Sequence, residues 1–131
     1  MKKEKKAHFC NVEFAIKKIL SNFALLLKNR NMEAFFRTHT YLVEHTFAPV
    51  RRILMDEIDW SDRLIGIKGA RGVGKTTFLL EYAKEHFNPQ DRRCLYVNMN
   101  NFYFQGRGIH DFAGEFYRQG GHVLLIDQIF K

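Results

Sequence analysis

Apolar residues recur at steps of three and four positions along the first sixty residues, a spacing typical of amphipathic helices. One such stripe covers residues 14–27, and the polar run at residues 28–31 is expected to end that helix. A second helix is predicted over residues 33–46, with Pro49 beyond its end. The same spacing predicts a shorter third helix over residues 50–58.

Short, continuous apolar runs replace this pattern in the second half of the chain. Residues 64–67, 94–98 and 122–127 are predicted as three buried strands, and helical spacing returns between them at residues 75–87 and 109–119. Strands that are apolar at every position are typical of a parallel sheet covered by helices on both faces. The order strand–helix–strand–helix–strand therefore predicts an α/β fold.

The net charge of +7 is concentrated at the N-terminal end of the chain. Residues 1–31 hold eight Lys or Arg and two Glu, a balance of +6, whereas residues 32–131 hold thirteen Lys or Arg and twelve Asp or Glu, a balance of +1. We therefore expect a basic extension at residues 1–31, helical or disordered, and a nearly neutral domain that begins close to Met32. The extension could contact nucleic acid, although a solvated tail is the simpler explanation.

Several classes of protein find no support in the sequence. No run of about 18 apolar residues is present, so no transmembrane helix and no membrane partner is predicted. Cys10 and Cys94 are isolated cysteines, typical of reduced thiols in a cytoplasmic protein. His39 and His45 have no acid or cysteine nearby at the spacing of metal ligands, so no zinc site is predicted.

The most informative stretch lies between the first predicted strand and the helix that follows it. Residues 69–76 satisfy the pattern G-x-x-x-x-G-K-[ST], in which glycines let a loop bend so that its N–H groups converge on phosphate. Lys75 can reach the β- and γ-phosphates of a nucleotide, and the Thr76 hydroxyl can bind the accompanying Mg²⁺. The candidate nucleotide-binding residues are Gly69, Ala70, Arg71, Gly72, Val73, Gly74, Lys75, Thr76 and Thr77.

An acidic residue ends the third predicted strand. Asp127 follows four apolar residues at the carboxyl end of that strand, which is the edge where ligands of open α/β sheets bind. A carboxylate at this edge can hold Mg²⁺ opposite Thr76. Thr76 and Asp127 are therefore the candidate metal-binding residues.

Together these two motifs resemble the AAA-type ATPases. In particular they are similar to a prokaryotic AAA family whose members carry an N-terminal helical lead-in and often a nuclease-like C-terminal domain. The resemblance covers about residues 33–131 and implies a P-loop NTPase sheet with flanking helices, with ATP and Mg²⁺ as cofactors. The implied Walker A residues are Gly69, Gly74, Lys75 and Thr76, and the implied Walker B residue is Asp127.

Two departures from that family pattern affect the expected function. Where the family has a catalytic Glu, this chain has Gln128, which can orient water but cannot accept its proton, so hydrolysis is expected to be slow. The strand expected between the first and third strands, and the residues that sense or complete the site, do not follow Asp127. We therefore expect a domain truncated after its third strand, an N-terminal fragment of an ATPase that could form oligomers when complete.

Other residues at the predicted ligand edge have simpler explanations. Asn98, Asn100 and Asn101 could contact a nucleotide, but such loops are usually structural. The aromatic run 102–104 with Arg107 could stack on single-stranded nucleic acid, although an aromatic packing loop is favoured. The function expected from the sequence is ATP binding, with Lys75 and Gln128 as the candidate catalytic residues. A non-catalytic nucleotide-binding module and a small-molecule phosphotransferase remain open as alternatives.

Overall fold

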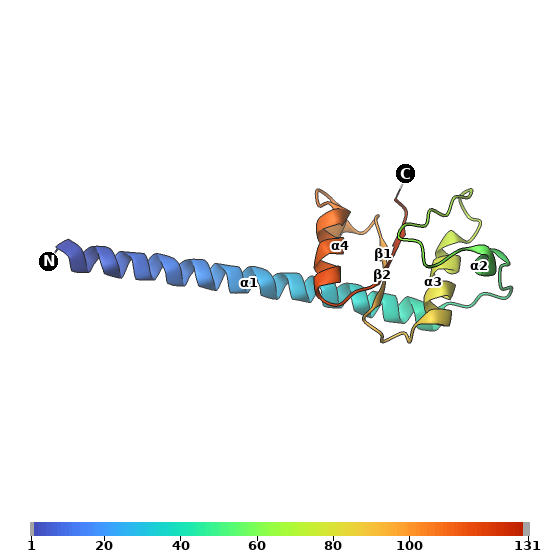
Figure 1. Cartoon of the computed structure of the whole chain (residues 1–131), viewed down its shortest axis with the longest axis horizontal. Helices are drawn as coiled ribbons and strands as arrows, with labels where there is room; N and C mark the ends of the chain where they lie inside the picture. The colour runs from blue at the N-terminus through green and yellow to red at the C-terminus, as the bar shows by residue number, and fades with distance from the viewer. Residues whose placement is uncertain (1, 130–131) are drawn as a thin grey trace. The chain divides into compact units, whose positions relative to one another are not determined.

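The computed structural model describes the backbone of residues 2–129 and the side chains of residues 17–129. The chain divides into two compact units, residues 1–34 and residues 35–131, and each is described by itself. None of the described helices is long and apolar enough to cross a membrane. In chain order the elements are α1 (Lys2–His45), α2 (Leu54–Glu57), α3 (Lys75–His86), β1 (Cys94–Asn98), the 3-10 helix η1 (Phe102–Phe104), α4 (Ile109–Arg118) and β2 (Val123–Asp127) (Figure 1).

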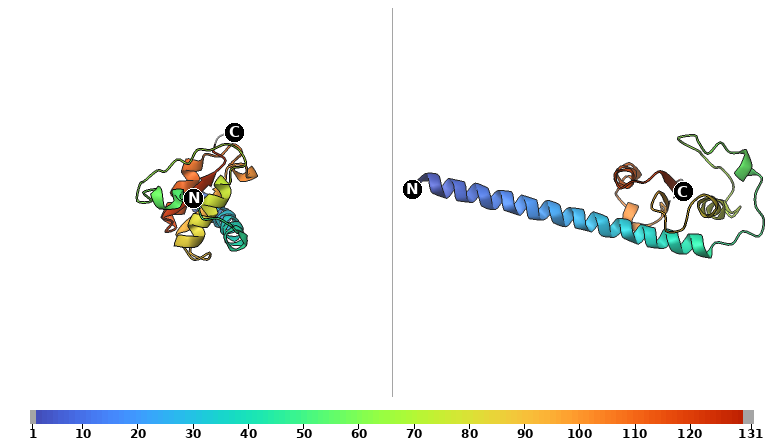
Figure 2. Two further views of the ribbon diagram at one scale, coloured as in Figure 1. Left: turned by 90° about the vertical axis from the view of Figure 1, so that its right-hand side faces the viewer. Right: turned by 60° about the horizontal axis from the view of Figure 1, so that its bottom comes forward.

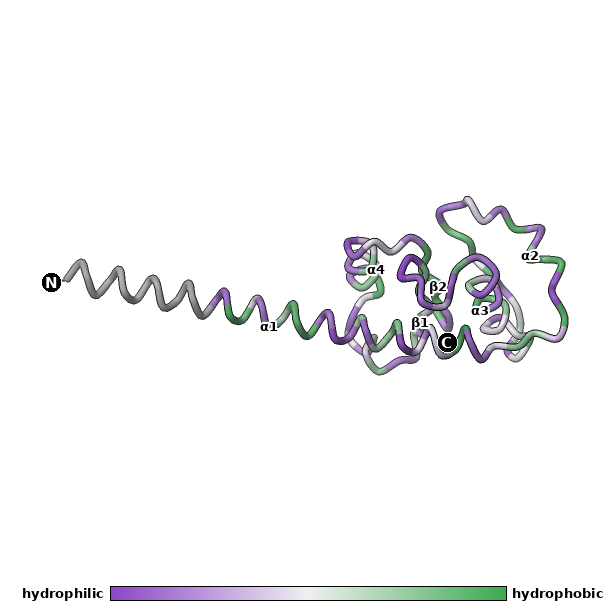
Figure 3. Tube along the Cα trace, turned by 90° about the horizontal axis from the view of Figure 1, so that it is seen from below, coloured by the Kyte–Doolittle hydropathy of each residue, from purple (hydrophilic) through white to green (hydrophobic). Residues whose placement is uncertain are grey.

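The first unit is helical throughout its described backbone, and the predicted helix end at residues 28–31 is wrong. That run contains neither Gly nor Pro, and Lys and Arg are good helix formers, so nothing in it breaks the helix. Hydrophobic and hydrophilic positions alternate along the described part of this helix (Figure 3), and its apolar side chains between residues 19 and 27 are 43–65% exposed. The side chains of Cys10, Phe14 and Ile16 lie outside the described residues.

The centre of the second unit is a parallel pair of strands, which confirms two of the three predicted strands. β1 and β2 pair from Cys94 opposite Val123 to Asn98 opposite Asp127. In β1 the residues from Cys94 to Val97 are all at most 4% exposed, so continuous apolar sequence does correspond to a strand buried on both faces. The helix α4 connects the two strands and begins and ends within one residue of its prediction.

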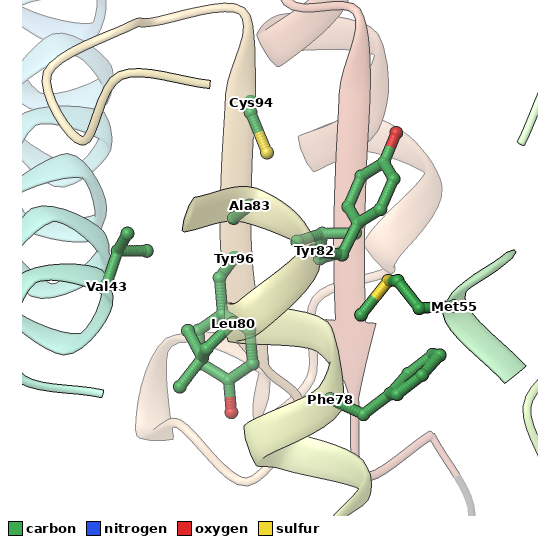
Figure 4. Packing of buried hydrophobic residues seen from close by; sticks show 9 residues of the cluster. Val43, Met55, Phe78, Leu80, Tyr82, Ala83, Cys94 and Tyr96 are labelled. Carbon is green, nitrogen blue, oxygen red and sulfur yellow. The ribbon is translucent and has the colours of Figure 1, made fainter. Parts of the chain in front are cut away.

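Helices cover both faces of these strands. Figures 1 and 2 show α3 and α4 on opposite sides of β1 and β2. The main core lies on the α3 side (Figure 4), where Cys94 and Tyr96 of β1 pack with a cluster whose buried members are Val43, Met55, Phe78, Leu80, Tyr82, Ala83 and Leu125. A second group, of aromatic rings, joins α1, η1 and α4, and the ring of Phe35 lies 5.0–5.5 Å from those of Tyr103, Phe104 and Phe112.

The last part of α1 covers the outer edge of β1. His39 is 1% exposed, and its Nδ1 accepts a hydrogen bond from the backbone N–H of Tyr96 at 3.0 Å. Burial lowers the pKa of this imidazole, which agrees with a neutral ring that accepts at Nδ1. Among the described residues its Nε2 has no hydrogen-bond partner. A strand edge that would otherwise expose its N–H groups is thereby closed by a helix.

The predicted first strand is wrong, because residues 64–67 form neither a helix nor a strand. Leu64 is 91% exposed, whereas Ile67 packs against the main core. A strand is held by hydrogen bonds to a neighbour, and in the part of the chain that the structure describes no strand pairs with this segment. The sheet therefore has two strands, where three were predicted.

The predicted helix over residues 50–58 is also wrong in its length, since α2 covers only Leu54–Glu57. Val50 and Ile53, which helical spacing predicts to face inward, are 74% and 75% exposed. The buried residue of α2 is Met55, whose carbonyl accepts a hydrogen bond from the Trp60 indole at 2.8 Å. Four residues make little more than one turn, so this helix depends on that packing.

Two glycines, one inside α4 and one just before β2, should respond oppositely to replacement by Ala. A Cβ on Gly121 would lie 2.4 Å from the buried ring of Phe116, so Gly121→Ala should lower the free energy of unfolding by about 1–3 kcal/mol. A Cβ on Gly114, inside α4, would meet no atom within 4 Å, so Gly114→Ala should raise it by about 1 kcal/mol. Urea unfolding of both variants tests this, and a stabilising Gly121→Ala would contradict the packing of Phe116.

Candidate functional site

The loop at residues 69–74 has a backbone that requires glycine at defined positions. Gly72 and Gly74 have φ values of +83° and +86°, in the left-handed region that side chains disfavour. Gly74 is the N-cap of α3, so the loop runs directly into the positive end of that helix. A Cβ on Gly69 would lie 3.0 Å from Cγ2 of Val73, which shows how closely the loop closes on itself.

The Lys75 side chain folds back over this loop. Its Nζ donates hydrogen bonds to the carbonyl oxygens of Gly69 and Ala70, both at 2.7 Å. The ammonium group is therefore held at the start of the loop by neutral partners. Its charge stays available for an anion that the loop N–H groups would bind.

Asp127 meets two hydroxyl groups at the carboxyl end of β2. Thr76, on the first turn of α3, donates a hydrogen bond to Asp127 Oδ2 at 2.5 Å. The Tyr96 hydroxyl, from β1, donates to the same oxygen at 2.8 Å, and the backbone N–H of Gln128 donates to Oδ1 at 2.9 Å. Asp127 is only 5% exposed, and these bonds stabilise its buried carboxylate.

The sequence motifs predicted that Thr76 and Asp127 would lie together, and the structure places them in direct contact. Tyr96 was not predicted as a site residue, because it lies within an apolar run and was interpreted only as core. Burial, and then its hydrogen bond to Asp127, raises the pKa of the Tyr96 phenol, so the hydroxyl remains a hydrogen-bond donor. The only signal in the sequence was a hydroxyl group on one of the predicted strands.

Two adjacent arginines before the loop were also not predicted as site residues. Arg52 donates a hydrogen bond to the carbonyl oxygen of Val73, inside the loop. Arg51 instead binds Asp56 on α2 at 2.5 and 2.8 Å and Glu85 on α3 at 2.8 and 3.3 Å. No local motif marks either residue, since the loop is about twenty positions further along the chain.

Gln128 has an unusual backbone and an exposed side chain. Its φ is 59°, and it is the only residue other than glycine with a positive φ in the described chain. This conformation is costly for a residue with a side chain, and residues that adopt it are enriched at functional sites. The remaining candidates Arg71 and Thr77 lie respectively at the exposed tip of the loop and in the first turn of α3.

The asparagine candidates serve local structure. The side chain of Asn98 accepts a hydrogen bond from the backbone N–H of Asn100 at 2.8 Å, and that of Asn101 accepts from Tyr103 N–H at 2.9 Å, which caps η1. These bonds favour the structural interpretation of this loop.

Most of the aromatic run packs inside the protein. Phe104 is 7% exposed, Tyr103 contacts the rings of Phe35 and Phe112, and only Phe102, at 80%, is strongly exposed. Arg107 lies over the outer face of Tyr103, 4.7 Å from the ring centre. The packing interpretation accounts for this loop, and a continuous stacking surface is not formed.

A glycine loop that leads into a helix, beside a strand that ends in a buried carboxylate, is typical of nucleotide-binding α/β domains. A family model described as an AAA domain matches residues 61–131, more than half of the chain. The chain therefore belongs to the AAA domain family, and membership of this family implies nucleotide binding in general. No curated protein and no solved structure gives a significant match.

The contact between Tyr96 and Asp127 yields a test of the site's construction. Tyr96→Phe should lower the free energy of unfolding by about 1.5–3 kcal/mol, because a buried carboxylate loses one hydrogen-bond donor. Tyr117→Phe is the matched control, since Tyr117 is 77% exposed, and it should leave stability unchanged. Equal urea midpoints for the two variants would show that the Tyr96 hydroxyl does not support Asp127.

Proposed function

We propose that this domain binds ATP together with Mg²⁺ at the loop of residues 69–76 and at Asp127. The observation that carries the proposal is the hydrogen bond from Thr76 to Asp127, which joins the end of the loop to the end of β2. In a P-loop site these are the two positions that meet at the metal. The same bond supports Walker A and Walker B roles for the two segments.

The chain's own groups supply the phosphate site. The left-handed glycines Gly72 and Gly74 shape a loop whose N–H groups can face an anion, and α3 adds the positive end of its dipole. Lys75, held over the loop by two carbonyl oxygens, would exchange these neutral partners for phosphate oxygens. All of these interactions favour a polyphosphate over a singly charged ligand.

The residues present also fit Mg²⁺. This ion prefers hard oxygen ligands, often one or two protein groups with water and phosphate. The Thr76 hydroxyl donates a hydrogen bond to the Asp127 carboxylate, so its oxygen lone pairs remain available, and the negative charge of Asp127 lies beside it. Bound there, Mg²⁺ would neutralise charge on the phosphates. Among the described residues no cluster of three His, Cys, Asp or Glu competes as a metal site.

The binding proposal does not require that the domain hydrolyses ATP efficiently. The position after Asp127 holds Gln128, which offers no general base, and this favours the second candidate, a nucleotide-binding module with little turnover. In the part of the chain that the structure describes, the apolar segment at residues 64–67 pairs with no strand, so it could accept a further strand. A phosphotransferase would in addition require a binding site for its acceptor.

The binding proposal predicts a ligand-dependent gain in stability. Mg-ATP at about a hundredfold excess over Kd should stabilise the wild-type chain by about 2.7 kcal/mol, seen as a rise in melting temperature. Lys75→Ala should lose most of this rise. Lys84→Ala should keep it, because Lys84 lies on the same helix but binds the Thr46 carbonyl, away from the loop. A wild-type melting temperature that does not change when Mg-ATP is added would contradict the proposal.

The role of Gln128 yields a separate prediction. Gln128→Glu should raise the ATP hydrolysis rate by about 10²- to 10⁴-fold, because it introduces the missing base with little change in shape. Gln105→Glu, at another exposed position, is the matched control and should leave the rate unchanged. Release of inorganic phosphate measures both, and equal rates in all three proteins would indicate that this position does not activate water.

A further inference from the structure

The guanidinium group of Arg52 lies directly on the phosphate loop, although Arg52 precedes the loop by many residues. It donates to the carbonyl oxygen of Val73 and lies 2.7 Å from the point where a Cβ on Gly74 would be. Gly74 is the residue immediately before Lys75. A second cation is therefore held at the loop, beside the residue that begins α3.

The charge of Arg52 differs from that of its neighbour in how it is compensated. Arg51 is bound by two carboxylates, those of Asp56 and Glu85. In the part of the chain that the structure describes, the only hydrogen-bond partner of Arg52 is a neutral carbonyl oxygen. Lys75 is held in the same way, by carbonyl oxygens alone. Two positive charges without an acidic partner thus lie at one short loop, which attracts a polyanion.

Arg51 explains why Arg52 stays close to the loop. Its paired bonds to Asp56 and Glu85 tie the segment before the loop to α2 and to the far end of α3. These bonds hold the segment around residue 52 near the helix that starts at Lys75. Only the side chain of Arg52 has to reorient to meet a ligand, which keeps the entropic cost of a new contact small.

We propose that Arg52 is a further phosphate-binding residue of this site, supplied by the segment before the loop. The inference rests on the proposed function, and it names the part of the ligand that this residue recognises: the polyphosphate chain, independently of the base. A guanidinium group can give two parallel hydrogen bonds to phosphate oxygens, so it adds both charge and orientation to the point charge of Lys75. In the absence of phosphate the Arg52 guanidinium group donates to the Val73 carbonyl oxygen instead.

The test compares four proteins in titration calorimetry: the wild type, Arg52→Gln, Arg52→Lys and the control Arg63→Gln. Arg63 is exposed and precedes the loop, so its replacement removes one charge without touching the site. The probes are Mg-ATP, Mg-GTP and tripolyphosphate, each at low and high KCl. The melting temperature of each ligand-free protein shows whether the fold is retained.

Arg52→Gln should weaken binding of both Mg-ATP and tripolyphosphate by about tenfold to a hundredfold, the usual loss for a hydrogen bond to a charged group. Its Kd should also depend less steeply on salt, since one cation is missing. Arg52→Lys should recover part of the affinity through its charge. Arg63→Gln should remain within about twofold of the wild type, and all ligand-free melting temperatures should agree.

The outcomes separate this inference from the proposal that it extends. If Arg52→Gln binds with wild-type affinity while Lys75→Ala loses binding, the role of Arg52 is overturned. The proposal of a nucleotide site at the loop is then retained. Equal weakening in Arg52→Gln and Arg52→Lys with unchanged salt dependence would show that Arg52 only positions Val73, which also overturns it. No binding of any probe by the wild type would overturn both proposals.

Discussion

The hydrogen bonds that Thr76 and Tyr96 donate to Asp127 hold the centre of this molecule together. They connect the first turn of α3, the middle of β1 and the end of β2, which are separated by 31 and 51 positions along the chain. A buried carboxylate is destabilising unless its oxygens are satisfied, so all three elements must be in place together. The candidate site and the sheet are therefore stabilised by the same contacts.

The elements that the sequence predicted well are those defined by local pattern. β1, β2, α3 and α4 each combine an apolar run or stripe with a clear stop, such as Asn88-Pro89 after α3 or Gly120-Gly121 after α4. Residues 64–67 have an equally apolar run but no strand, because a strand also needs a partner that local sequence cannot supply. The sequence predicted two helices where the structure has the single helix α1. The polar run between them was interpreted as a helix end, but it contains no residue that breaks a helix.

The same distinction holds within the site. The glycine loop and Lys75 could be predicted because their chemistry needs adjacent residues at fixed spacing. Asp127 could be predicted from its place at the end of an apolar strand. The contacts of Tyr96 and Arg52 could not, because each contact joins distant segments of the chain and neither residue has a local signature. Roles that depend on long-range contacts require the structure.

The buried imidazole of His39 at the edge of β1 makes the sheet sensitive to acid. His39 is buried with its pKa below its ordinary value of 6.5, so the folded chain binds fewer protons than the unfolded chain near that pH. Its contribution to stability is present above pH 6.5 and is lost as the pH falls through the lowered value. Protonation at Nδ1 would also remove the acceptor of the hydrogen bond from the backbone N–H of Tyr96. Acid strong enough to protonate His39 should therefore weaken the contact between the last part of α1 and β1.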